Sequence, residues 1–180
     1  MPEWSRLAKR IRVPVGFAFA VAYLWLSRPT AASVFQGSVL VIVGLVVRTL
    51  ASGYVRKNEE LATTGPYAYT RNPLYLGSLI LAIGFAWVAQ SFWILAGVVL
   101  MFFAIYLPVI TGEEEFLRER FAEFGSYSNA VPRIFPRFTA YRKDASKFSW
   151  ALYKQHREYN ALAGSAALLV VMAAKAWHKF

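Results

Sequence analysis

Residues 64–77, TGPYAYTRNPLYLG, combine turn-forming, aromatic and basic residues directly before an apolar segment. Gly65-Pro66 predicts one turn and Asn72-Pro73 a second, and Pro73 suits the first turn of a helix, where its missing N–H is not needed. The start of that helix leaves backbone N–H groups unpaired and carries a partial positive charge. Such a helix start can hold a carboxylate or another polar ligand.

The tyrosines of this stretch allow two interpretations. Tyr67, Tyr69 and Tyr75 could offer their ring faces to a flat heterocycle,. They could equally anchor a proline-initiated helix at the level of the lipid headgroups. Taken alone, these residues favour the second interpretation.

Three consecutive carboxylates, Glu113 to Glu115, follow the longest apolar run of the chain. One arrangement that would suit them is a new helix with Thr111 as N-cap and Glu114 at the third helical position, a capping box. In the other, one carboxylate pairs with a cationic or hydroxyl-bearing ligand. The spacing alone leaves both open.

Composition indicates a membrane protein. Of the 180 residues, 57% are hydrophobic and 17% charged, against about 45–50% and about 25% in a soluble domain. The run Ser91–Ile110 carries no charge and is long enough to span a bilayer,. The absence of cysteine excludes disulfides and thiolate sites, and two histidines make a metal site unexpected,. The net charge of +10 then indicates membrane orientation and anionic lipid, and we expect no nucleic-acid partner,.

We therefore predict a single all-α integral membrane domain over residues 1–180, with about five transmembrane helices. Gln90 and Ser91 alone separate two of them, which predicts a tight helical hairpin, and Pro14 is placed in the first turn of the first helix,. The predicted spans are Ile11–Leu26, Ser33–Leu50, Leu74–Ala89, Phe92–Ile110 and Ala161–Trp177.

Charge placement predicts the orientation. With the N-terminus in the cytoplasm and the C-terminus on the opposite side, only Arg28, Lys175 and Lys179 of the 20 Lys and Arg residues lie outside. All ten acidic residues also fall inside. This arrangement obeys the positive-inside rule, so we expect any site to face the cytoplasm.

Two cytoplasmic segments are long enough to form a site, residues 51–73 and 111–160. The second begins with TGEEEFLRERFAEF, a helical pattern, and continues through VPRIFPRF, whose prolines exclude a helix,. It ends in ASKFSWALYKQHREYN, a basic and aromatic stretch expected to lie on the membrane surface.

The order of these motifs resembles that of the integral membrane methyltransferases related to isoprenylcysteine carboxyl methyltransferase and phospholipid methyltransferase. Their pattern is an R-H/N-P-x-Y-x-G element that enters one transmembrane helix and a Glu-Glu pair after the next. Here GPYAYTRNPLYLG, the hairpin, EEEFL and a later Tyr127…Val131-Pro132-Arg133…Pro136 follow in that order. The resemblance assigns residues 57–136 as a methyltransferase-like core. Residues 138–180, the amphipathic segment and an extra C-terminal helix, have no counterpart in the pattern.

The resemblance implies S-adenosylmethionine as cofactor and methyl transfer to a lipid-like or prenylcysteine-like acceptor at the cytoplasmic face. Glu113 could accept from ribose hydroxyls or from the amino group, and a tyrosine ring could stack on adenine. Arg133 is a weaker candidate for contact with the acceptor, and no catalytic residue or metal ligand is implied. The cofactor-binding residues carried over from the family pattern are Lys57, Leu61, Ala62, Tyr67, Arg71, Asn72, Pro73, Leu74, Tyr75, Glu113 and Glu114.

The sequence departs from the pattern at two motif positions. Asn72 stands where many members have His, and Asn still donates and accepts hydrogen bonds,. Val109 stands one turn before the Glu pair, where eukaryotic carboxyl methyltransferases have an Arg that is thought to face the substrate carboxylate.

Two other functions remain open from the sequence. Membrane sterol and steroid reductases share a similar G-x-Y…R-H/N-P-x-Y-x-G element but bind NADPH, and the Glu pair with Val131-Pro132-Arg133 argues against them here. A membrane scaffold without a cofactor is the other alternative. The expected partners are the lipid bilayer and a lipophilic or lipidated acceptor.

Overall fold

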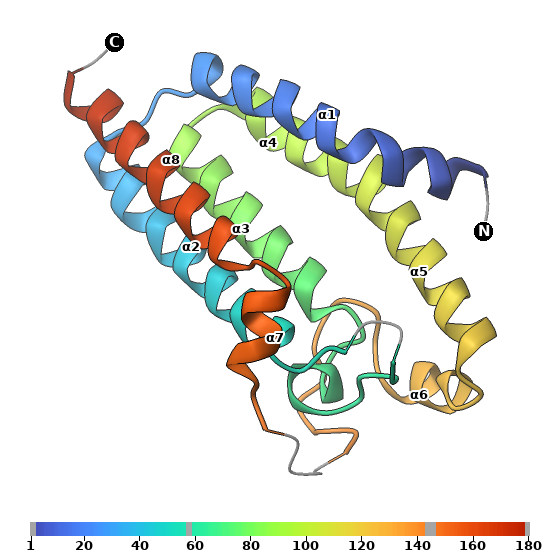
Figure 1. Ribbon diagram of the computed structural model, residues 1–180. Coiled ribbons are helices and arrows are strands. Elements are labelled where there is room, and N and C mark those ends of the chain that lie inside the picture. Colours follow the sequence, from blue (N-terminus) through green and yellow to red (C-terminus); the bar gives the residue numbers. More distant parts are fainter. Residues whose placement is uncertain (1–2, 57–58, 143–146, 179–180) are drawn as a thin grey trace.

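The computed structural model describes residues 3–56, 59–142 and 147–178. The regular elements of these residues are all helical (Figure 1). They are α1 (Glu3–Leu26), α2 (Ala31–Ser52), the short 3₁₀ helix η1 (Gly65–Ala68), α3 (Pro73–Ala89), α4 (Phe92–Met101), the π-helical turn η2 (Phe102–Tyr106), α5 (Leu107–Arg120), α6 (Phe124–Ala130), α7 (Trp150–Gln155) and α8 (Tyr159–His178).

The long helices form two packed groups. In one, α2 packs against both α3 and α8, and in the other α1 runs along α4, η2 and α5 (Figure 1). The predicted hairpin joins the groups: Gln90 takes a left-handed conformation at the end of α3, and α4 begins at Phe92. The described parts of the connecting segments, residues 53–56, 59–72, 121–142 and 147–149, gather at the end of the bundle where α5 ends (Figure 1).

Glycines let α2 and α3 approach at backbone distance. A Cβ built on Gly84 of α3 would lie 2.8 Å from the Val41 backbone nitrogen of α2. One built on Gly44 of α2 would lie 2.7 Å from the Gly77 carbonyl oxygen of α3. Small residues at such crossings are typical of membrane helix pairs, where close packing replaces the hydrophobic effect. Gly77 and Gly84 thus lie on the face of α3 that packs against α2.

The apolar run from Phe92 continues without interruption into the acidic segment. No helix starts at Thr111, because α5 already begins at Leu107 and the Thr111 hydroxyl donates 3.0 Å to the Leu107 carbonyl. The capping-box interpretation is therefore wrong. Pro108 is accommodated by the π-helical turn η2 just before it. Because proline has no N–H, Pro108 cannot donate to the Ala104 carbonyl, which accepts instead from the Trp4 indole at 3.0 Å,.

The first helix begins earlier than the apolar pattern predicts. It starts at Glu3, so Pro14 lies inside α1 and the prediction that places it in the first turn is wrong. The hydrophobic pattern misses the first turns because Arg6, Lys9 and Arg10 are solvent-exposed helix formers,. These turns pack through Ala8, which is fully buried against Ile105 and Val109.

Three helical stretches of the described residues are long and apolar enough to cross a membrane: Ala31–Ser52, Phe92–Arg120 and Tyr159–His178. Their outer faces expose large apolar side chains such as Phe35, Leu100 and Val170, as expected of helices that face lipid,. The chain is thus an all-helical membrane protein. That α1 and the shorter apolar α3 also cross stays a prediction.

The glycine contact gives a first testable prediction. Gly84→Ala places a methyl group against the backbone of α2, which cannot move aside without separating the helices, so we expect a loss of about 1–3 kcal/mol,. The measurement is the thermal unfolding midpoint in detergent. Gly164→Ala in α8 is the matched control, because a Cβ there meets nothing within 4 Å. Equal midpoints for the two variants would contradict the close contact.

Candidate functional site

A cavity of about 630 Å³ opens where the helix ends meet the connecting segments. Its walls come from the first half of α1, the end of α2, the segment around η1, the start of α3, α5, α6 and the turn before α8. Polar and apolar groups share the lining. The lining residues used below are Arg48, Leu61, Tyr67, Arg71, Asn72, Leu74, Tyr75, Ser78, Glu113, Glu114, Leu117, Phe124 and Glu158.

The segment before α3 is held by backbone bonds to the segment that follows α6. Arg71 N–H donates 3.0 Å to the Pro132 carbonyl, Arg137 N–H donates 2.9 Å to Tyr69, and Tyr141 N–H donates 2.9 Å to Ala68. These bonds hold the GPYAYT turn in place. The segment VPRIFPRF is not helical, as its prolines predict,.

Glu114 is the centre of a buried polar network. Its side chain is 8% exposed and lies 3.2 Å from the Arg71 guanidinium and 2.9 Å from that of Arg133. The Asn72 amide donates 3.0 Å to the same carboxylate and also 3.0 Å to the Arg133 carbonyl. The network ties α5 to the start of α3 and to residues 131–134.

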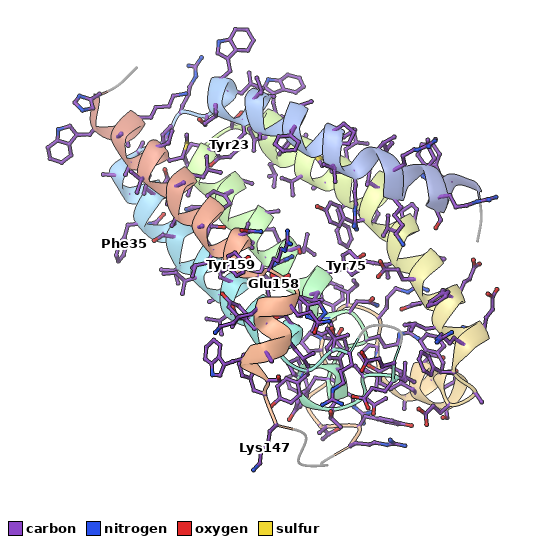
Figure 2. The ribbon with its side chains drawn as sticks, in the orientation of Figure 1. Tyr23, Phe35, Tyr75, Lys147, Glu158 and Tyr159 are labelled. Carbon is purple, nitrogen blue, oxygen red and sulfur yellow. The ribbon has the colours of Figure 1, made fainter. Side chains whose placement is uncertain are left out.

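Glu113 faces a different partner. Its carboxylate accepts 3.0 Å from the Tyr75 hydroxyl, and both side chains line the cavity. Figure 2 shows Tyr75 projecting from the start of α3 toward α5. One carboxylate oxygen thus keeps acceptor capacity toward the cavity.

Two phenols of the site stay protonated at all ordinary pH values. Burial raises the pKa of the Tyr67 phenol far above its usual range, and the neighbouring side chains of Tyr127, Glu113 and Glu158 raise it further. Burial likewise raises the pKa of Tyr127, whose hydroxyl donates 2.7 Å to the Tyr67 carbonyl. Both tyrosines are therefore hydrogen-bond donors, not anions.

An arginine–glutamate pair lines the cavity on the α2 side. The Glu158 carboxylate accepts from Arg48 Nε at 3.0 Å and from Nη2 at 2.9 and 2.8 Å, a bidentate contact. The side chains are 23% and 11% exposed, and Arg48 Nη1 donates to the Ser78 hydroxyl. Figure 2 shows Glu158 at the turn between α7 and α8.

A smaller cavity of about 200 Å³ adjoins the first and is almost wholly apolar. Tyr75 and Ser78 line both cavities, so they mark the boundary between them. Gly16 and Phe19 of α1, Leu79 and Ala82 of α3, Val98 and Met101 of α4, and Phe102 and Tyr106 of η2 complete the lining of the smaller one.

Most of the predicted site residues line the larger cavity. Pro73 starts α3, as predicted, and is buried, but it is not a lining residue, and neither is Arg133, which contacts Glu114. Lys57 lies outside the described residues. The predicted residues that line the cavity are Leu61, Ala62, Tyr67, Arg71, Asn72, Leu74, Tyr75, Glu113 and Glu114.

Sequence reasoning missed Arg48 and Glu158. Arg48 had a signal, since a lone arginine inside an apolar segment usually has a buried partner or a functional role,. Glu158 had none, because its partner lies 110 positions away. In the described part of the chain, no group of three or more His, Cys, Asp or Glu could hold a metal ion.

A family model described as phospholipid methyltransferase matches residues 31–123, from the start of α2 to just beyond α5. The Val131-Pro132-Arg133 element and the C-terminal arm, residues 147–178, lie outside this match. The matched region nevertheless contains the whole wall from Leu61 to Tyr75 and both Glu113 and Glu114.

Two curated bacterial proteins are similar to this chain. The cobalt-zinc-cadmium resistance protein CzcN of Cupriavidus metallidurans is 37% identical over 91 residues, 51% of this chain and 42% of that protein. The nickel-cobalt-cadmium resistance protein NccN of Alcaligenes xylosoxydans xylosoxydans is 33% identical over 124 residues, 68% of this chain and 57% of that protein. The chain therefore spans about half the length of these relatives. No solved structure matches it.

The Glu114 network gives the second prediction. The Arg71 side chain is only 13% exposed, and Glu114→Gln removes the negative charge that faces it. Because this leaves a buried guanidinium without its counter-ion, we expect the free energy of unfolding to fall by about 3 kcal/mol or more. The measurement is thermal unfolding together with protease cleavage of residues 121–142, which the network holds in place. Glu119→Gln, an exposed position on the same helix, is the control. A Glu114→Gln protein as stable and as resistant as the control would show that the network does not anchor this segment.

Proposed function

The chain belongs to the phospholipid methyltransferase family, and on this premise we propose that it transfers the methyl group of S-adenosylmethionine to a lipid-like acceptor at the cytoplasmic membrane face. One observation carries the proposal. The motif residues from Leu61 to Tyr75 and Glu113 meet around a polar cavity that adjoins an apolar one at Tyr75 and Ser78.

The larger cavity fits such a cofactor in size and chemistry. Its volume of about 630 Å³ lies in the usual range for small-molecule sites,. A sulfonium nucleoside has an aromatic base, a diol and an amino-acid end, and the wall offers apolar side chains at Leu61 and Phe124, a carboxylate at Glu113, and guanidinium groups,. The bound cofactor would supply a methyl group already activated by the positive sulfur.

The protein has little chemistry to perform on such a methyl group. If the acceptor displaced the methyl group from sulfur, with the electron pair of the broken bond left on sulfur, the side chains would only have to align the two molecules and exclude water. Glu113 is positioned by Tyr75 at 3.0 Å and is suited to accept from hydroxyl or amino groups,. Leu74 lines the same cavity. We assign no residue as a general base.

The smaller cavity suits the apolar part of an acceptor. It lies between α1, α3 and α4, within the apolar part of the bundle, and shares its boundary residues with the polar cavity. A hydrocarbon chain there would place its head near Tyr75. Val109 is buried against α1 and lines neither cavity, so the position that carries an arginine in carboxyl methyltransferases makes no acceptor contact here.

The proposed orientation follows from charge. The start of α1 and the end of α5 lie at the same end of the bundle (Figure 1), and residues of both helices line the polar cavity. Most Lys and Arg residues belong to this end. With five spans, the positive-inside rule then places the cavity in the cytoplasm. The two curated relatives are named for metal resistance, and those names state no reaction, so the proposal rests on the family and on the cavity.

Cofactor choice gives the third prediction. S-adenosylhomocysteine should raise the thermal unfolding midpoint of the purified protein, because a ligand that binds only the folded state stabilises it by about 2.7 kcal/mol at a hundredfold excess over Kd. Glu113→Gln should weaken this effect, and Tyr75→Phe should weaken it less. Stabilisation by NADPH but not by S-adenosylhomocysteine would favour the reductase alternative, and stabilisation by neither would favour a scaffold.

Acceptor class gives the fourth prediction. Incubated with radiolabelled S-adenosylmethionine and a total membrane lipid extract, the protein should transfer label to an organic-soluble product that thin-layer chromatography resolves. Glu113→Gln should reduce the labelled product about tenfold or more, since a charge-assisted contact to the cofactor is lost. Label found only in water-soluble small molecules would contradict the lipid-like acceptor while leaving methyl transfer intact.

A further inference from the structure

We propose that Arg48 and Glu158 together bind the amino-acid end of the cofactor, with the guanidinium taking its carboxylate and the Glu158 carboxylate taking its ammonium group. This inference rests on the proposed function and deepens it. It assigns a binding role to the C-terminal arm, residues 147–178, which the family match does not include.

The pair keeps hydrogen-bonding capacity of both signs toward the cavity. Arg48 uses Nε and Nη2 on Glu158 and one Nη1 hydrogen on Ser78. A guanidinium has five N–H donors and Arg48 makes four such contacts in all, so one Nη1 hydrogen remains for a ligand,. Glu158 Oε1 accepts only from Nη2 among the described residues, which leaves it lone pairs for an ammonium group,. Both side chains line the cavity.

A paired arginine and glutamate favour a zwitterion over a simple ion. A lone anion on Arg48 would meet the negative charge of Glu158, and a lone cation on Glu158 would meet Arg48,. The carboxylate and the ammonium of an amino acid sit on one carbon atom, so both can contact a side-by-side pair of opposite charges. The low exposure of the pair, 23% and 11%, limits screening by solvent,.

The location of the pair agrees with the transfer geometry. Ser78, which Arg48 contacts, lines both cavities, so the pair lies near the boundary where donor and acceptor would meet. The amino-acid end of the cofactor is bonded to the reacting sulfur through a short chain. The apolar lining residues Leu61, Leu117 and Phe124 belong to a different cluster, which is available to contact the adenine ring of the cofactor.

The C-terminal arm is built to deliver Glu158. Ser149 N–H donates 3.0 Å to the Gly53 carbonyl, and His156 Nδ1 lies 3.2 Å from the Ser52 carbonyl, so α7 docks on the end of α2. Arg157, directly before Glu158, has a φ of 54°, a left-handed conformation that costs a non-glycine residue about 1–2 kcal/mol,. The surrounding contacts hold this strained turn and direct Glu158 toward Arg48.

The test compares two nucleosides in binding to the purified full chain by calorimetry. S-adenosylhomocysteine carries the amino-acid end and methylthioadenosine lacks it, so the ratio of their affinities measures that end alone. We expect the wild type to prefer S-adenosylhomocysteine, and Glu158→Gln to lose about tenfold or more of that preference. The affinity for methylthioadenosine should stay within about twofold, which also shows that the variant is folded. Glu158→Asp, which keeps the charge, should restore part of the preference, and the exposed control Glu119→Gln should keep all of it.

Three results would overturn the proposal. An equal loss of affinity for both nucleosides would make Glu158 a structural residue. An unchanged preference in Glu158→Gln would place the amino-acid end elsewhere in the cavity. A wild type that binds neither nucleoside would refute the proposed function itself, and the assignment of Arg48 and Glu158 with it.

Discussion

The buried carboxylate of Glu114 is the constraint on which the site depends. Without a partner, an ionised carboxylate 8% exposed would be very costly, and so would the Arg71 guanidinium beside it,. Glu114, Arg71 and Arg133 offset one another's charge, the Asn72 amide adds a hydrogen bond, and together they fix three segments that are far apart in the sequence. The start of α3 cannot leave α5, and the segment after α6 cannot leave either, without exposing a bare charge to an apolar interior. The cavity is the space that this arrangement leaves open.

The same helix explains why two adjacent glutamates do different work. Successive residues of an α-helix point about 100° apart, so Glu113 and Glu114 cannot serve one partner. Glu114 accepts hydrogen bonds from Asn72 and Arg133 and pairs with Arg71, so its contacts are all within the protein. Glu113 faces the cavity, where Tyr75 occupies one of its oxygens. A pair of glutamates in this family pattern therefore couples one structural carboxylate to one that can meet a ligand, which neither a single glutamate nor a capping box would achieve.

Much of the fold could be predicted from local pattern, and the rest depended on distant contacts. Apolar runs, the hairpin at Gln90-Ser91 and the helix start at Pro73 follow from residues that are neighbours in sequence. The continuity of the helix through Thr111 does not, because Pro108 argues for a break and only η2 and the Trp4 indole make the passage possible. The Arg48–Glu158 pair joins residues 110 positions apart, and nothing around Glu158 marks it as buried. The same holds for the motif residues of the site. Their order in the sequence predicted a shared cofactor site, but the contacts of Glu114 that bring the segments together could not be predicted from it.

The pairing of Arg48 with Glu158 also explains how a charged side chain can lie on the wall of the larger cavity. A guanidinium on an apolar helix of a membrane protein needs a counter-charge, because its transfer out of water is unfavourable. α2 and α3 supply only Ser78 among the described contacts, so the counter-charge comes from the C-terminal arm. Gly77 contributes to the same arrangement, since a Cβ there would lie 2.7 Å from Arg48 Cγ and displace the side chain. The glycine crossing that packs α2 on α3 thus also sets where Arg48 can lie, and the packing of the bundle and the polarity of the cavity are determined by the same few residues.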